Sequence, residues 1–130
     1  NALFQKGIEQ SMARWEIDAS GYIESSAYAT LSGTTEEKFE QIGNQMWVAF
    51  IPNHQEAYSN MRRTGYPVIQ QRTDPMLSKG VTNGYLPKRL IYPYTVEKTL
   101  NGENMQIAID RMGGDKIDTP VWWDVRDVNR

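Results

Sequence analysis

The chain has 130 residues, of which 39% are hydrophobic and 23% are charged, and this ordinary globular composition excludes a chain that is disordered throughout. The formal net charge of −2 excludes a strongly basic nucleic-acid arm, so we expect no nucleic-acid partner. Because there is no cysteine and only one histidine, His54, disulfides, thiol nucleophiles and cysteine zinc sites are excluded, and we expect neither a metal site nor a cofactor.

The first predicted helix covers about residues 1–15. Phe4, Ile8, Met12 and Trp15 recur at helical spacing and form one apolar stripe. We therefore expect this helix to pack one face against a core.

The second predicted helix has the clearest start. Thr34 is followed three residues later by Glu37, which is the pattern of a capping box. Apolar residues then follow helical spacing up to Ile51, and Pro52 cannot continue the helix because it lacks a backbone N–H.

The third predicted helix follows almost at once. Asn53 is a good N-cap with Glu56 in the first turn, Gly65 is placed to end the helix, and Pro67 stops it. Since only about three residues separate this helix from the preceding one, the two are expected to form an antiparallel hairpin.

The fourth predicted helix begins at Asn101 and ends before Gly113 and Gly114. Its predicted buried stripe consists of Met105, Ala108, Ile109 and Met112.

Two stretches, 16–33 and 66–100, carry no helical period. The second is long for a loop, yet it contains residues too apolar to remain in water, such as Tyr85, Leu90, Tyr92 and Tyr94. We therefore expect long ordered loops that pack on parts of a larger protein. The spacing from Phe39 through Gly43 also has the shape of a tetratricopeptide unit, which cannot bury its own face alone.

Aspartates gather near the C-terminus, and two of them, Asp115 and Asp118, are candidates for the paired carboxylates of a glycosidase. The alternative is that these aspartates are solvated turn residues around the glycine pair. We favour the second interpretation and expect no catalytic residue. The whole group is Asp110, Asp115, Asp118, Asp124 and Asp127.

Aromatic residues are the candidates for ligand binding. Trp122 and Trp123 are adjacent, and neighbours on a strand point to opposite faces, so one would be buried and one free to stack on a sugar ring. Tyr85 lies in the long loop, where binding surfaces are common. The alternative is that all three pack in a core or pin a loop.

Two compact basic motifs are predicted to be structural. The first contains Arg62, Arg63, Gly65, Tyr66 and Pro67, and the second contains Arg89. Arginine forks can hold loop carbonyls or carboxylates in a buried network, whereas nucleic-acid contacts would need a basic stripe that is not present.

Several motifs occur in a specific order along the chain: GIEQSM at 7–12, QMWVAF at 45–50, RRTGYP at 62–67, LPKRLIYP at 86–93, GGD at 113–115 and PVWWD at 120–124. Together they resemble the C-terminal part of the SusD/RagB-like outer-membrane lipoproteins of Bacteroidetes. Mild departures are Tyr58, where tryptophan is frequent in the family, and Lys88, where arginine is frequent.

This resemblance implies a mainly α fold of tetratricopeptide-like helix pairs with long ordered loops. Residues 1–130 would be the C-terminal part of a single SusD-like domain without an internal boundary. The matched motifs are similar to motifs that have a structural role in the family. The resemblance therefore identifies no sugar-contacting residue in this chain.

The resemblance also implies a function. The protein would bind an oligosaccharide at the cell surface and deliver it to a TonB-dependent SusC-like transporter in the outer membrane, without catalysis. It would be attached through an N-terminal lipid anchor that this chain does not contain. The alternatives are a helical protein–protein interaction scaffold or transporter lid without sugar affinity and, more remotely, a glycoside hydrolase domain.

Overall fold

The structure, a computed structural model, describes residues 1–76, 78–93, 96–124 and 126, excluding the side chains of 96–98. Within these ranges the regular structure is helical and contains no strand, which confirms the predicted mainly α class. The chain divides into two compact units, Asn1–Pro67 and Val68–Arg130. The expectation of a single domain without an internal boundary stays a prediction.

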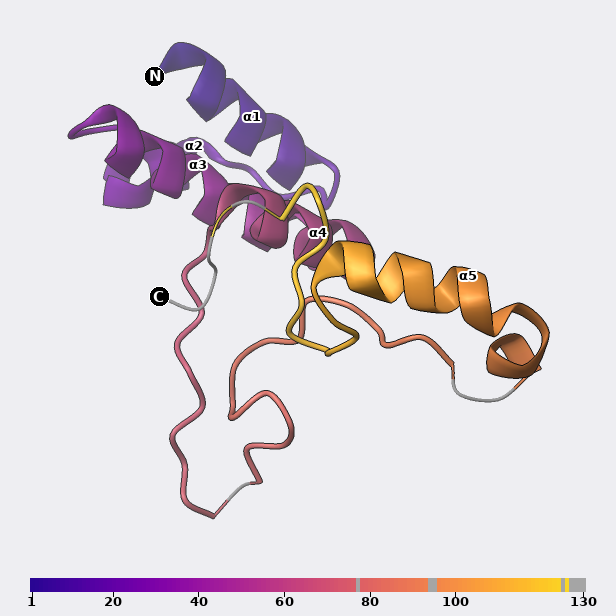
Figure 1. Cartoon of the computed structure of the whole chain (residues 1–130). Helices are drawn as coiled ribbons and strands as arrows, with labels where there is room; N and C mark the ends of the chain where they lie inside the picture. The colour runs from indigo at the N-terminus through magenta and orange to yellow at the C-terminus, as the bar shows by residue number, and fades with distance from the viewer. Residues whose placement is uncertain (77, 94–95, 125, 127–130) are drawn as a thin grey trace. The chain divides into compact units, whose positions relative to one another are not determined.

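Four α-helices and one short 3₁₀ turn form the first unit (Figure 1). Helix α1 packs against α3, and α3 packs against α4. The elements are α1 (Ala2–Ala13), α2 (Ser20–Ser25), η1 (Ala27–Ala29), α3 (Thr35–Ala49) and α4 (His54–Thr64).

Helix α1 ends two residues before its predicted end. Ile8 is buried and Phe4 and Met12 are half-buried, as the stripe predicts, but Trp15 lies beyond the helix and is 59% exposed. The chain turns away at Glu16, whose φ is 59°. The predicted place of Trp15 in the buried stripe is therefore wrong.

Helix α2 and the η1 turn lie in a stretch where no helix was predicted. They have six and three residues, which is too short to show an apolar stripe. Asp18 supports the start of α2, because its carboxylate accepts hydrogen bonds from the Ser20 hydroxyl at 2.6 Å and the Ser20 N–H at 3.0 Å. These bonds lower the pKa of Asp18.

The predicted start of α3 and both predicted ends of α4 are confirmed, whereas α3 ends at Ala49, two residues before its predicted end at Ile51. The capping box is complete, since the Thr34 hydroxyl accepts the Glu37 N–H at 3.3 Å and the Glu37 carboxylate accepts the Thr34 N–H at 2.6 Å. Asn53 Oδ1 accepts the Glu56 N–H at 3.3 Å at the start of α4. At the other end Gly65 adopts φ 79°, a left-handed conformation that favours glycine.

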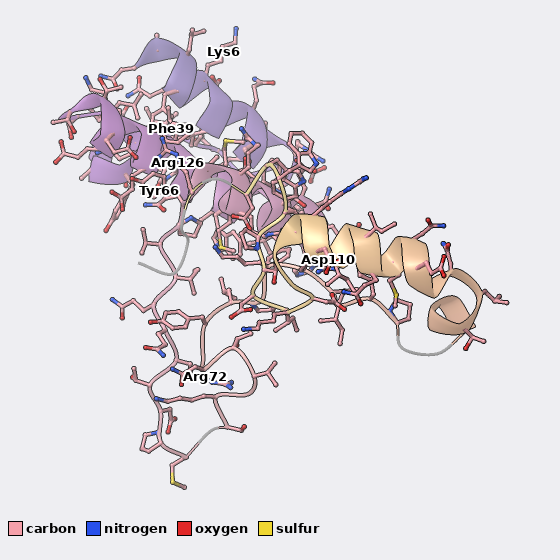
Figure 2. All side chains as sticks on the ribbon, viewed as in Figure 1. Lys6, Phe39, Tyr66, Arg72, Asp110 and Arg126 are labelled. Carbon is pink, nitrogen blue, oxygen red and sulfur yellow. The ribbon has the colours of Figure 1, made fainter. Side chains whose placement is uncertain are left out.

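Tyr66 fixes the α3–α4 hairpin from just beyond the end of α4. Its ring meets Phe39 edge-on, with centroids 5.9 Å apart, and its hydroxyl donates to Glu36 Oε1 at 2.7 Å. Gly43 leaves room for it, because a Cβ there would lie 2.6 Å from the Tyr66 Cβ. Figure 2 labels Phe39 and Tyr66, which belong to this contact.

In the second unit, α5 (Val96–Met112) is interrupted at Asn101, where φ is −139°. The part after Asn101 is the predicted fourth helix, and Asn101 Oδ1 accepts a hydrogen bond from Asn104 Nδ2 at 2.7 Å. The helical turn before Asn101 was not predicted. The helix ends as predicted, because the Gly114 N–H reaches the Ile109 carbonyl at 3.0 Å.

All members of the predicted buried stripe of α5 are half-buried in the structure. Its members are Met105, Ala108, Ile109 and Met112.

The long loop before α5 is held by its own hydrogen bonds. The Arg72 N–H donates to the Gly84 carbonyl at 2.9 Å, Gln71 Nε2 donates to the Asn83 carbonyl at 2.6 Å, and the Arg72 guanidinium donates to the Ser78 carbonyl. Figure 2 labels Arg72 on this loop. These hydrogen bonds connect residues 71–72 of the loop to residues 78–84, although the described residues of the loop form no helix or strand.

Candidate functional site

Trp122 is the most exposed of the three predicted ligand-binding aromatics. It lies in a turn that closes where the Asp124 N–H donates to the Val121 carbonyl at 2.9 Å, so the strand assumed for the tryptophan pair is wrong. The turn still gives the two rings different surroundings, because Trp122 is 90% exposed and Trp123 is half-buried. Asp124 at the base of this turn is buried.

Tyr85 is held by a second tight turn. Its N–H donates to the Thr82 carbonyl at 3.1 Å, and the Thr82 hydroxyl donates to the Tyr85 carbonyl at 2.7 Å, which leaves the residue 38% exposed. No ring contact joins Tyr85 to Trp122, both of which the structure describes. The two aromatic rings therefore do not stack on each other.

An ion pair joins two of the sequence motifs in the second unit. Arg89 Nη1 lies 2.9 Å from Asp115 Oδ1, with both side chains at least nine-tenths buried. The Tyr92 N–H lies 3.2 Å from each carboxylate oxygen of Asp115, and the Arg89 guanidinium lies 5.0 Å from the centre of the Tyr92 ring. We call this group, Arg89, Tyr92 and Asp115, the Arg–Asp latch.

Backbone hydrogen bonds reinforce the latch. The N–H groups of Lys88 and Arg89 both donate to the Ile117 carbonyl, at 2.7 and 3.1 Å. The segment after Tyr85 is thereby tied to the segment that precedes Trp122. The latch thus helps to set the chain path on which both candidate aromatics lie.

The prediction that Asp115 is a solvated turn residue is wrong, because Arg89 pairs with it across 26 positions in the sequence. That interpretation is also wrong for Asp124, which is buried, and it holds for Asp118, which is exposed in a turn. Asp110 is exposed as expected but lies within α5 rather than in a turn, and Asp127 lies outside the described residues. Within the described ranges no group of three or more metal-ligating side chains occurs. With Asp115 engaged by the latch, Asp115 and Asp118 do not form a free carboxylate pair.

The basic motif at the end of α4 has one buried and one exposed arginine. Arg62 is buried, with its guanidinium 5.0 Å from the centre of the Tyr58 ring, while the exposed Arg63 donates to Asn60 Oδ1 at 2.5 Å. The Thr64 hydroxyl donates to the Asn60 carbonyl at 2.8 Å. This motif terminates α4 and places Tyr66 and Pro67, which are joined by a cis peptide bond.

An apolar groove of about 870 Å³ lies in the first unit and was not predicted. Side chains from α1 and α3 line it together with the residues that follow each helix. Sequence reasoning identified the stripes of the two helices separately, but no sequence signal showed that they leave a gap between them. We call it the α1–α3 groove, and its apolar lining includes Leu3, Phe4, Ile8, Met12, Trp15, Ile17, Ile42, Met46, Val48, Ala49 and Ile51.

The sequence profile of the family described as "SusD-like: Susd and RagB outer membrane lipoprotein" matches residues 25–124. No curated protein matches the chain. In the described part of the chain no helix is both long and apolar enough to cross a membrane.

The solved structures that are similar to the chain include the following three. A "Bacteroidetes AC2a SusD-like" protein matches 95% of it at 28% identity with a TM-score of 0.79. A SusD homolog from Bacteroides uniformis matches 95% at 28% identity with a TM-score of 0.75. A "chitin-binding protein" matches 82% at 39% identity with a TM-score of 0.66.

The match covers only part of each solved structure, namely 25%, 31% and 22% of the three chains in that order. The helical fold described above is thus one part of a larger SusD-like fold. The profile match spans most of the chain, and the motifs quoted above lie mainly within it. The chain belongs to the SusD/RagB family of outer membrane lipoproteins.

Proposed function

We propose that this chain is part of a cell-surface lipoprotein that captures an oligosaccharide and delivers it to a TonB-dependent, SusC-like transporter in the outer membrane. A lipid anchor outside residues 1–130 would hold the protein at the surface. The role is binding, and the energy for import would come from the transporter complex.

The observation that carries this proposal is the similarity of the chain to SusD-like structures, one of which is a "chitin-binding protein" 39% identical over 82% of this chain. This similarity supports an oligosaccharide of the chitin type as the first ligand to test. Such a ligand offers flat apolar sugar faces together with polar amide groups.

We assign Trp122 as a stacking surface for the sugar. An indole ring combines a large flat apolar face with one N–H donor, which suits a sugar ring that is apolar on its faces and polar at its edge. Trp122 presents that face almost entirely to solvent in the described structure, and the turn from Val121 to Asp124 holds its backbone. Tyr85 is the second candidate, with a smaller exposed fraction.

The direct test is calorimetric titration of the full-length protein with chitin oligosaccharides, and with maltoheptaose for comparison. We expect saturable binding of the chitin oligosaccharides. The variant Trp122→Ala should bind about tenfold more weakly, which corresponds to ~1.4 kcal/mol, because the stacking face is lost.

The matched control is Tyr28→Ala, which removes an exposed aromatic side chain from the first unit. This control should bind like the unchanged protein. Full affinity in Trp122→Ala would refute the assignment of Trp122, whereas absence of binding to any glycan would refute the proposed ligand class.

A second candidate function is a helical scaffold or transporter lid without sugar affinity, which the α1–α3 groove favours because apolar surfaces of this kind serve protein contacts. The titration separates the two functions. We do not propose a glycosidase, since Asp115 is engaged in the Arg–Asp latch. Turnover of a chromogenic glycoside that is lost in Asp118→Asn would contradict this choice.

A further inference from the structure

Two asparagine–glycine pairs occur in the second unit, Asn83–Gly84 and Asn101–Gly102. In such a pair the backbone nitrogen of the glycine can attack the side-chain amide carbon of the asparagine, because the attack closes a five-membered ring and glycine has no side chain to obstruct it. Both asparagines are exposed, so solvent access does not distinguish the two pairs. The backbone around each pair therefore decides which one reacts.

The Asn83–Gly84 pair is held in a tight turn. Its two residues adopt positive φ values of 54° and 84°. The Gly84 nitrogen, which would have to attack, already donates to the Lys79 carbonyl at 2.7 Å, and the Gly84 carbonyl accepts the Arg72 N–H at 2.9 Å. A Cβ at Gly84 would lie 2.5 Å from the Arg72 carbonyl oxygen, so this glycine is packed closely against the loop. Ring closure here would cost the hydrogen bond of the attacking nitrogen.

The Asn101–Gly102 pair has a more open setting. Asn101 interrupts α5 with a φ of −139°, and a Cβ at Gly102 would meet nothing within 4 Å. Asn101 Oδ1 accepts a hydrogen bond from Asn104 Nδ2 at 2.7 Å, and this donor stabilises the negative charge that develops on the oxygen during the attack. Asn101 Nδ2, which would leave as ammonia, makes no hydrogen bond to the residues that the structure describes.

We propose that Asn101–Gly102 is a site of spontaneous deamidation, whereas the turn protects Asn83–Gly84. The Gly102 nitrogen forms a bond to Asn101 Cγ and loses its proton, while the Cγ–Nδ2 bond breaks and ammonia leaves. The product is a five-membered succinimide. One water molecule then opens the ring at either carbonyl and yields aspartate or isoaspartate, so water is the only co-reactant.

Either product changes the start of the helix that follows residue 101. An aspartate adds one negative charge near the positive end of the helix dipole and can still act as an N-cap. An isoaspartate instead adds a methylene group to the main chain and so changes the path from the turn before residue 101 into the rest of α5. The proposed site thus alters α5 without a change in the encoded sequence.

Peptide mass spectrometry of the full-length protein, incubated at mildly alkaline pH, tests the proposal. Trypsin cleaves after lysine and arginine, so the two pairs fall on separate peptides, 80–88 and 99–111. We expect Asn101 to deamidate about tenfold faster than Asn83, which corresponds to one hydrogen bond that the Gly84 nitrogen must give up. In denaturant the turn is lost, and the two pairs should react at similar rates.

Gly102→Ala is the matched control, because its methyl group fits the open space and obstructs the attack. It should slow deamidation of Asn101 about tenfold and leave the rate at Asn83 unchanged. Equal rates at the two pairs in the native protein, faster reaction at Asn83, or an unchanged rate in Gly102→Ala would overturn the proposal. No glycan takes part in these measurements, so their failure would leave the proposed function standing.

Discussion

Gly43 is a residue of the first unit at which a single methyl group would collide with a buried aromatic side chain. Its backbone conformation is ordinary, so the constraint is steric: a Cβ would lie 2.6 Å from the Cβ of Tyr66. Tyr66 cannot retreat easily, because its ring contacts Phe39 and its hydroxyl is bonded to Glu36.

We therefore predict that Gly43→Ala destabilises the full-length protein by about 1–3 kcal/mol, the usual cost of overpacking a core. Urea unfolding measures this change. Gly21→Ala in α2 is the control, since a Cβ there meets nothing within 4 Å, and it should change stability by less than about 0.5 kcal/mol. Equal stability of the two variants would show that α3 and α4 can separate at little cost.

Glu37 makes the start of α3 sensitive to pH. Its pKa lies below the ordinary value because the Thr34 backbone N–H, and after it the Thr34 hydroxyl, hydrogen-bond to the carboxylate. The unfolded chain therefore takes up this proton at a higher pH than the folded protein does. The contribution of Glu37 is complete above the unfolded pKa and is lost as the pH falls through the folded pKa.

We predict that amide exchange in the first turn of α3 loses protection as the pH falls below the ordinary glutamate pKa of 4.5 and that Glu37→Gln removes this pH dependence. Hydrogen-exchange mass spectrometry of the α3 peptide provides the measurement, with the first turn of α1 as the internal reference. An unchanged pH dependence in Glu37→Gln would assign the effect to another group.

At the scale of elements, the sequence predicted helix termini well where the capping residue contacts neighbours only a few positions away. Thr34, Asn53 and Gly65 terminate their helices through contacts within a few residues, so the sequence pattern contains the whole interaction. Helix α2 and the turn before Asn101 were missed because short helices show no stripe. Trp15 was misplaced because the chain turns at Glu16, which no stripe signals.

Long-range pairing is the part that could not be predicted. The sequence identifies Arg89 as a structural arginine and Asp115 as a turn residue, but nothing local shows that they meet. The same reason hides the α1–α3 groove, which exists only when α1 and α3 pack side by side. The exposure of Trp122 depends on a turn in place of the assumed strand.

The Arg–Asp latch yields a prediction for the loops of the second unit. Because breaking a buried ion pair leaves one charge unpaired, Arg89→Met should cost about 3–5 kcal/mol and loosen segments 86–93 and 113–119. Hydrogen exchange of those two segments reports the loosening locally. The exposed Lys116→Ala is the control and should leave them protected.

The double variant Arg89→Met/Asp115→Asn identifies the pair as the cause. Its cost should be smaller than the sum of the two single variants, because removing both charges leaves neither one buried alone. Strictly additive costs would indicate that the two side chains act independently.

At the scale of the whole molecule, the chain is one part of a SusD-like fold. Its two units contain the helix hairpin completed by Tyr66 and the loops tied by the Arg–Asp latch. The exposed Trp122 is the surface that, on this account, meets the sugar. This assignment depends on the protein working as a glycan-binding surface lipoprotein together with a transporter.

The most direct measurement of that central claim is affinity isolation of the tagged native protein from detergent-solubilised outer membrane, followed by mass analysis of what accompanies it. The account predicts a product several times larger than 14.9 kDa that co-isolates with a large β-barrel transporter. A free-standing soluble protein of about 14.9 kDa without a partner would contradict it.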